Sequence, residues 1–91
     1  MDYNKDGSDL EFNRDAVARV IKMYRLKKDL SQEVLSGLAG IPRSHLTAIE
    51  CGTKLPNFET IWRLCNALGL PPHEMVKSIE EDTAILYKGD K

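Results

Sequence analysis

The chain has 91 residues, of which 42% are apolar and 30% are charged, and its formal net charge is −1. These values are typical of one globular domain with a modest core, and they leave no room for a separate ligand-sensing domain. The apolar runs span only a few residues, which argues against a membrane-spanning segment, and the acidic start is unlike a secretory signal. We therefore expect a cytoplasmic protein that does not bind membranes.

The charges are distributed unevenly along the chain. Residues 1–12 sum to −3, residues 13–69 to +4 and residues 70–91 to −2. A basic middle between acidic ends suits a polyanion such as nucleic acid, and a merely solvated surface is the alternative interpretation.

The first predicted elements are an arm and a helix. Residues 1–12 are expected to form a flexible acidic arm. Asn13 is a suitable N-cap for a helix that extends to about Lys27, because the apolar residues after it recur at helical spacing. Those apolar residues are Val17, Val20, Ile21 and Tyr24.

A second, short helix is predicted over residues 32–39, with Ser31 as its N-cap. Gly40 ends this helix, because glycine readily takes the left-handed conformation, and Pro42 is tolerated in the first turn of the next helix. The apolar side of the second helix consists of Val34, Leu35 and Leu38.

The third helix is predicted to extend from Pro42 to Cys51, with Gly52 after it. At about 100° per residue, Leu46 and Ile49 point toward the core. The opposite face carries Arg43, Ser44, Thr47, Ala48 and Cys51.

Two more helices and a tail complete the predicted chain. Asn57 caps a fourth helix that ends at Leu68, and Pro71-Pro72 opens a fifth. Residues 83–87 are apolar and predict an edge strand or a sticky terminal segment. The core sides of these helices comprise Phe58, Ile61, Trp62, Cys65 and Leu68 in the fourth, and Met75, Val76 and Ile79 in the fifth.

Residues 31–52 thus contain two short helices joined by a turn, and the second helix has a polar outer face. This layout is typical of a helix-turn-helix, in which the second helix enters the major groove of DNA. Its side chains can then meet base edges, while Lys, Arg and backbone amides meet phosphates. The sequence predicts an all-α DNA-binding domain over residues 13–79 and a C-terminal tail over residues 80–91.

Four stretches carry a wider resemblance. They are LSQEVL at 30–35, AGIPRSHLTAIECG at 39–52, PNFETI at 56–61 and ALGL at 67–70. Together they resemble the lambdoid phage repressor and Cro (XRE) family of five-helix DNA-binding domains. The resemblance implies a compact lambda-repressor-like fold. It also implies a sequence-specific transcriptional regulator, a repressor, that binds double-stranded DNA as a homodimer without a cofactor.

The resemblance also implies roles for individual residues. Gln32 matches the glutamine that contacts a phosphate and braces the recognition helix, and Arg25 and Glu50 match a structural ion pair. The positions that face the bases in the groove are Arg43, Ser44, Thr47 and Ala48. The further positions at the DNA backbone are Thr53, Lys54 and Asn57.

Four positions depart from the family pattern. Val34 stands where an acidic residue would complete a capping box, and Ser36 stands where an alanine usually forms a tight contact between helices. Pro42 replaces a capping Ser or Thr, and Cys51 replaces a polar residue. None of these changes removes the groove-facing surface, but Ser36 and Pro42 bear on the angle of the recognition helix.

Several of these residues have an alternative interpretation. Arg43 has the fork to read guanine but can instead grip a phosphate, and Ser44 and Thr47 can be merely solvated. Ala48 offers a methyl group to thymine or is simply a good helix former. His45 is predicted to be a half-buried packing residue.

The remaining cysteine and aromatic residues indicate no further chemistry. Cys51 and Cys65 are predicted to be free thiols, and neither has metal-ligand spacing with a histidine. Phe58 and Trp62 are predicted to be core residues and not a platform on which bases stack.

Dimerisation is expected because one small domain covers one half-site, and two copies about 34 Å apart bind a near-palindrome much better. The predicted interface is the fifth helix, extended by the tail. A second hypothesis is an antitoxin-type or accessory module of the same fold that binds a toxin or another regulator. An enzyme is not expected, since no nucleophile–base pair, metal cluster or phosphate-binding glycine loop is found. The interface residues are Met75, Val76, Ile79, Ile85, Leu86 and Tyr87.

Overall fold

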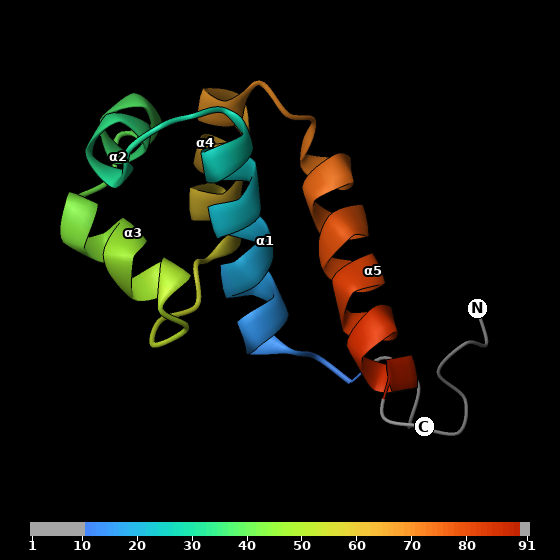
Figure 1. The fold of residues 1–91 in the computed structure, drawn as a ribbon. Helices are drawn as coiled ribbons and strands as arrows, with labels where there is room; N and C mark the ends of the chain where they lie inside the picture. The colour runs from blue at the N-terminus through green and yellow to red at the C-terminus, as the bar shows by residue number, and fades with distance from the viewer. Residues whose placement is uncertain (1–10, 90–91) are drawn as a thin grey trace.

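The computed structural model describes residues 11–89, and the side chains of residues 11–84 (Figure 1). This part of the chain contains no strand, and the predicted all-α, five-helix fold is confirmed. The helices are α1 (Arg14–Lys27), α2 (Gln32–Ala39), α3 (Arg43–Glu50), α4 (Phe58–Leu68) and α5 (Pro72–Gly89).

The helices surround one core, to which each contributes at least one fully buried side chain. In Figure 1, α1 stands in the middle, α5 runs beside it, and α2 and α3 lie on the other side. α3 is attached to the core by Leu46 and Ile49, which are 0% and 1% exposed. α3 is therefore held by apolar packing along one side. The large core side chains are Ile21, Leu35, Leu46, Ile49, Leu64, Leu68 and Met75.

The starts of α1, α2 and α4 and the end of α2 are where the sequence places them. Asn13 accepts hydrogen bonds from the backbone amides of Asp15 and Ala16, and Ser31 accepts one from Val34 at 3.0 Å. Gly40, between α2 and α3, has a φ of 72°, a left-handed conformation that costs other residues energy. The three predicted N-caps, Asn13, Ser31 and Asn57, are all confirmed.

Replacing Asn57 with alanine is expected to destabilise the protein by about 1 kcal/mol, the usual cost of losing an N-cap. The Asn57 Oδ1 atom accepts a hydrogen bond from the backbone amide of Thr60 at 2.8 Å, and alanine leaves that amide without a partner. Thermal unfolding checks the loss. Asn66→Ala, an exposed change inside the same helix, is the control, and equal melting temperatures for the two variants would contradict the capping role.

Four side chains predicted to face the core are instead exposed. Val34 and Leu38 of α2 are 47% and 63% exposed, and Phe58 and Trp62 of α4 are 68% and 48% exposed. The buried stripe of each helix is narrower than predicted, because Leu35 of α2 and Cys65 and Leu68 of α4 are buried as predicted while these four side chains are not. α2 turns its smaller residues Ser36 and Ala39 inward beside Leu35, and α4 turns Thr60 and Leu64 inward.

The C-terminal part of the chain also differs from the prediction. The edge-strand alternative for residues 83–87 is wrong, because α5 continues to Gly89. Asp82 lies on this extension and forms an ion pair with Arg19 of α1 at 2.7 Å, so the helix remains attached to α1 beyond residue 79. None of the described helices has the length and apolarity that a membrane crossing requires.

The predicted dimer surface on α5 needs a correction as well. Met75 is 0% exposed because it lies in the core of this chain, so it is not available to a second copy. Val76 is 50% exposed and Ile79 is partly buried. The side chains of Ile85, Leu86 and Tyr87 lie outside the described residues.

Candidate nucleic-acid interface

The outer face of α3 is polar and open to solvent, as predicted from the sequence. Arg43 and Ser44, in the first turn, are exposed, and Thr47 and Ala48 are partly exposed. Pro42 occupies the N-cap position with extended backbone and supplies no side-chain hydrogen bond. The first-turn amides of α3 therefore lack the cap that α2 and α4 have.

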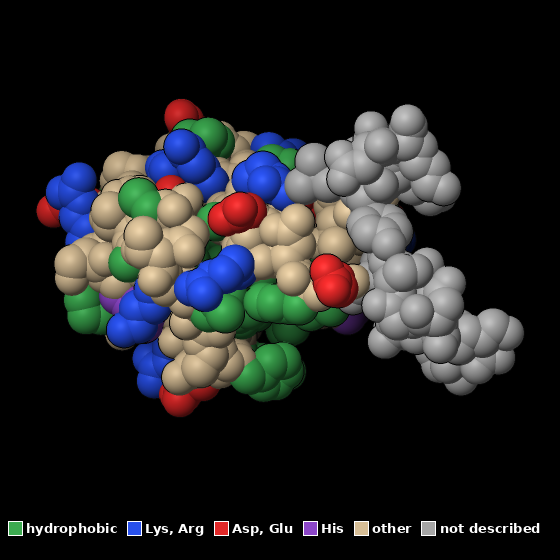
Figure 2. Space-filling model, turned by 90° about the horizontal axis from the view of Figure 1, so that it is seen from below, with side chains coloured by type: hydrophobic (Ala, Val, Ile, Leu, Met, Phe, Trp, Pro, Cys, Tyr) green, Lys and Arg blue, Asp and Glu red, His purple; other side chains and the backbone are tan. Residues whose placement is uncertain are grey.

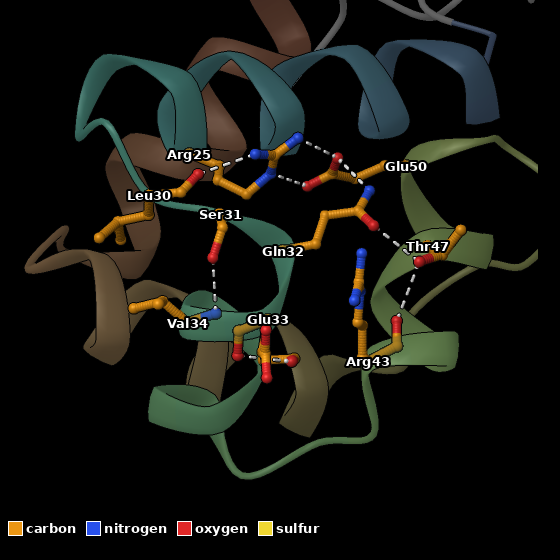
Figure 3. A network of polar contacts seen from close by, with 10 residues as sticks. Arg25, Leu30, Ser31, Gln32, Glu33, Val34, Arg43, Thr47 and Glu50 are labelled. Atoms are coloured by element: carbon orange, nitrogen blue, oxygen red, sulfur yellow. Dashed lines mark hydrogen bonds and ion pairs between the residues drawn. The ribbon is translucent and has the colours of Figure 1, made fainter.

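A buried ion pair joins α1 to the end of α3 (Figure 3). The Arg25 Nε and Nη2 atoms donate to the two carboxylate oxygens of Glu50 at 2.7 and 2.9 Å, and Nη1 donates to the Leu30 carbonyl at 2.8 Å. The two side chains are only 10% and 2% exposed. The hydrogen bond that Arg25 donates to Glu50 raises the pKa of Arg25 although burial opposes it, so the guanidinium stays charged.

Gln32, the first residue of α2, extends this network to α2. Its Nε2 atom donates to Glu50 Oε1 at 3.0 Å, and its Oε1 atom accepts from the Thr47 hydroxyl at 2.8 Å. Figure 3 shows the Gln32 amide between Glu50 and Thr47, with both partners on α3. Side chains from α1, α2 and α3 thus form one hydrogen-bonded unit, which fixes α3 relative to the core.

The other residues predicted at the DNA backbone lie just beyond α3. The backbone amides of Thr53 and Lys54 donate to the Ala48 carbonyl at 3.1 and 3.3 Å, and the Thr53 hydroxyl also donates to it at 3.1 Å. Both side chains are exposed. Asn57 is exposed too, although its side-chain oxygen is engaged as the cap of α4.

Sequence reasoning missed the bond between Thr47 and Gln32, which lie 15 positions apart. Ser36, which stands where the family usually has alanine, is buried. Its hydroxyl donates to the Glu33 carbonyl at 3.1 Å, so this polar group has a hydrogen-bond partner. His45 is partly buried as predicted, and its Nε2 atom is buried without a partner in the described part of the chain.

The two cysteines are free. Cys51 is exposed just after the last turn of α3, and Cys65 is buried in the core. Burial raises the pKa of the Cys65 thiol, because desolvation disfavours the thiolate. The Cys65 thiol is therefore unreactive and serves to fill the core, in agreement with its predicted place on the core side of the fourth helix.

The fold and this interface define a helix-turn-helix protein. The helix-turn-helix family model matches residues 21–75, more than half of the chain. The chain therefore belongs to the helix-turn-helix family, and the resemblance found in the sequence is confirmed.

Individual relatives agree with this membership. The chain is 33% identical over 60 residues to the cryptic phage CTXphi transcriptional repressor RstR of Vibrio cholerae. The match covers 66% of this chain and 54% of the repressor, so the chain spans about half the length of that relative.

Two solved structures show the same architecture. The restriction-modification controller protein C.AhdI of Aeromonas hydrophila has a TM-score of 0.66 and 31% identity, over 68% of this chain and 94% of its own. The clp gene regulator ClgR of Corynebacterium glutamicum has a TM-score of 0.81 and 18% identity, over 89% of this chain and 86% of its own. The ClgR likeness concerns the fold alone.

Proposed function

We propose that this protein is a sequence-specific DNA-binding transcriptional regulator, acting as a repressor, that reads the major groove with α3. The observation that carries the proposal is the polar outer face of α3, which is braced from behind by the hydrogen-bond network of Arg25, Glu50 and Gln32. Membership of the helix-turn-helix family and the likeness to a transcriptional repressor support it. The protein acts in the cytoplasm and has no catalytic role.

The contacts divide into two kinds. Arg43, Ser44, Thr47 and Ala48 face the bases, where Arg43 has the geometry to reach the two acceptors of guanine. The positions that contact phosphates are Gln32, Thr53, Lys54 and Asn57. Phosphate contacts set register and orientation, and base contacts set specificity.

Selection of bound sites from random duplexes, followed by footprinting, tests the proposal. The expected result is an enriched half-site repeated with a centre-to-centre spacing of about one helical turn. Retention of no duplex above background, in dilute buffer and with folded protein, would refute DNA binding.

Arg43→Ala and Lys54→Ala are expected to act differently on DNA binding. Arg43→Ala should reduce the preference for the selected site over a scrambled one by about 1–3 kcal/mol. Lys54→Ala should lower the affinity for all duplexes alike, and it should reduce the slope of log affinity against log salt concentration by about 1. Fluorescence anisotropy at several salt concentrations, on selected and scrambled duplexes, separates the two effects. Lys77→Ala on the exposed side of α5 is the control. An unchanged preference in Arg43→Ala would rule out base reading by this residue.

The regulator acts as a homodimer, and a groove between α4 and α5 is the surface that we assign to the second copy. The groove has a volume of 470 Å³ and a mostly apolar lining. Phe58 lines it, and the ring of Phe58 lies 5.8 Å from that of the exposed Trp62. Figure 2 shows hydrophobic side chains gathered on this end of the molecule. Exposed apolar patches of this kind mark protein interfaces. The groove residues include Phe12, Val17, Leu55, Pro56, Phe58, Ile61, Val76 and Ile79.

A further inference from the structure

We propose that Thr47 is a positioning residue, which acts together with Glu50 to hold the Gln32 amide so that one N–H of that amide points at a DNA phosphate. The inference rests on the proposed function. Under this inference the Thr47 hydroxyl positions Gln32, in place of the base contact that the sequence predicts and that the proposed function includes.

Glu50 determines which way the Gln32 amide faces. Because two guanidinium nitrogens of Arg25 donate to its carboxylate, Glu50 is ionised and can only accept hydrogen bonds. The Gln32 atom 3.0 Å from Glu50 Oε1 must therefore be the amide nitrogen. The opposite orientation would place the amide oxygen against a carboxylate oxygen, with no proton between them.

This orientation in turn decides what the Thr47 hydroxyl does. The Gln32 oxygen, which can only accept, faces Thr47 Oγ1 at 2.8 Å, so the hydroxyl must donate to it. The Arg43 carbonyl competes for the same proton from the longer distance of 3.1 Å. The single Thr47 proton is therefore directed into the protein, and none is left to donate to a base.

One hydrogen-bond donor of Gln32 remains after these contacts. The Nε2 atom carries two N–H groups, and Glu50 engages one of them. Gln32 is partly exposed at the first residue of α2, so the second N–H can reach a phosphate oxygen. Because Glu50 and Thr47 hold both ends of the amide before DNA arrives, binding immobilises fewer side-chain rotamers. Such a contact strengthens binding to every sequence equally.

The experiment compares Thr47→Val with Thr47→Ser on selected and scrambled duplexes. Valine has the shape of threonine but no hydroxyl. Thr47→Val should therefore lower the affinity for both duplexes by the same factor, about threefold to tenfold, which corresponds to the free energy of one hydrogen bond. The salt slope should not change, because a neutral hydrogen bond releases no counterion. Thr47→Ser keeps the hydroxyl and should restore both affinities. In a Gln32→Ala background, Thr47→Val should have no further effect.

Other outcomes would overturn the positioning role. Equal affinity of Thr47→Val and the wild-type protein would show that the hydroxyl has no part in binding. A loss confined to the selected duplex and shared by Thr47→Ser would instead show that the threonine methyl reads a base. Melting temperatures of all variants show whether each is folded.

A measurement without DNA separates failure of this inference from failure of the proposed function. In the free protein, Thr47→Val should lower the NMR order parameter of the Gln32 side-chain amide, and Thr47→Ser should not. An unchanged order parameter in Thr47→Val would overturn the inference even if DNA binding is confirmed. Absence of DNA binding by the wild-type protein would overturn the proposed function.

Discussion

Replacing Glu50 with alanine is expected to destabilise the fold by about 3–5 kcal/mol, because it leaves the buried Arg25 charge without a partner. The Glu50 side chain is 2% exposed and that of Arg25 is 10% exposed, so water can replace the lost carboxylate only poorly. A protein of this size has little stability to lose, and the variant should be largely unfolded at moderate temperature. Urea and thermal unfolding, compared with the wild-type protein, measure the effect.

Two variants test the physical cause of this loss. Glu59→Ala breaks the exposed ion pair with Arg63, in which the Glu59 side chain is 72% exposed, and should cost less than about 0.5 kcal/mol. The double variant Arg25→Leu/Glu50→Leu removes both charges and should be less destabilised than Glu50→Ala. If Glu50→Ala melted at the same temperature as Glu59→Ala, the buried pair would not support the fold.

Replacing Val76 with glutamate is expected to convert the dimer to a monomer and to weaken binding to a two-half-site operator by about 10²–10⁴-fold, the usual gain from linked binding. Val76 lines the groove between α4 and α5 and is 50% exposed. A carboxylate there is tolerated in the monomer but would be desolvated against a second copy, next to the Glu80 that already lines the groove. Binding to a single half-site should change little.

The matched control is Met23→Glu, which introduces the same charge at a 41% exposed apolar position on α1, outside the α4–α5 groove. Analytical ultracentrifugation and binding to duplexes with one and two half-sites measure both variants. A Val76→Glu protein that sediments as a dimer would refute this interface. Loss of self-association in Met23→Glu alone would place the interface on α1.

The outcome of the sequence predictions divides according to the range of the interactions. The caps at Asn13, Ser31 and Asn57 are correct because each bonds an amide two or three positions away, within the reach of a local pattern. Gly40 is correct because its left-handed φ depends on that residue alone. The orientation of α3 is also correct, since Leu46 and Ile49 are its only large aliphatic side chains.

The side chains wrongly predicted to be buried lie in α2 and α4, which carry more apolar residues than the core accommodates. α2 offers Val34, Leu35 and Leu38, but only Leu35 is buried. Helical periodicity could not choose among these side chains, because the choice depends on how α2 packs against α3 and α4, and the small residues Ser36 and Ala39 are buried with Leu35. The exposed Phe58 and Trp62 have the same explanation in α4, where Phe58 lines a groove formed with a helix further along the chain and the Trp62 ring lies beside that of Phe58.

The helix-turn-helix layout, the starts of the helices and the outward side of α3 can be predicted from the residues alone, because they depend on interactions within a few positions. The hydrogen bonds that Gln32, Thr47 and Glu50 share, and the exposure of Phe58 and Trp62, become visible only in the folded arrangement of the helices. These features arise where separate helices pack, and hydrogen bonds between residues 15 and 18 positions apart form only after the core has fixed the distance between the helices.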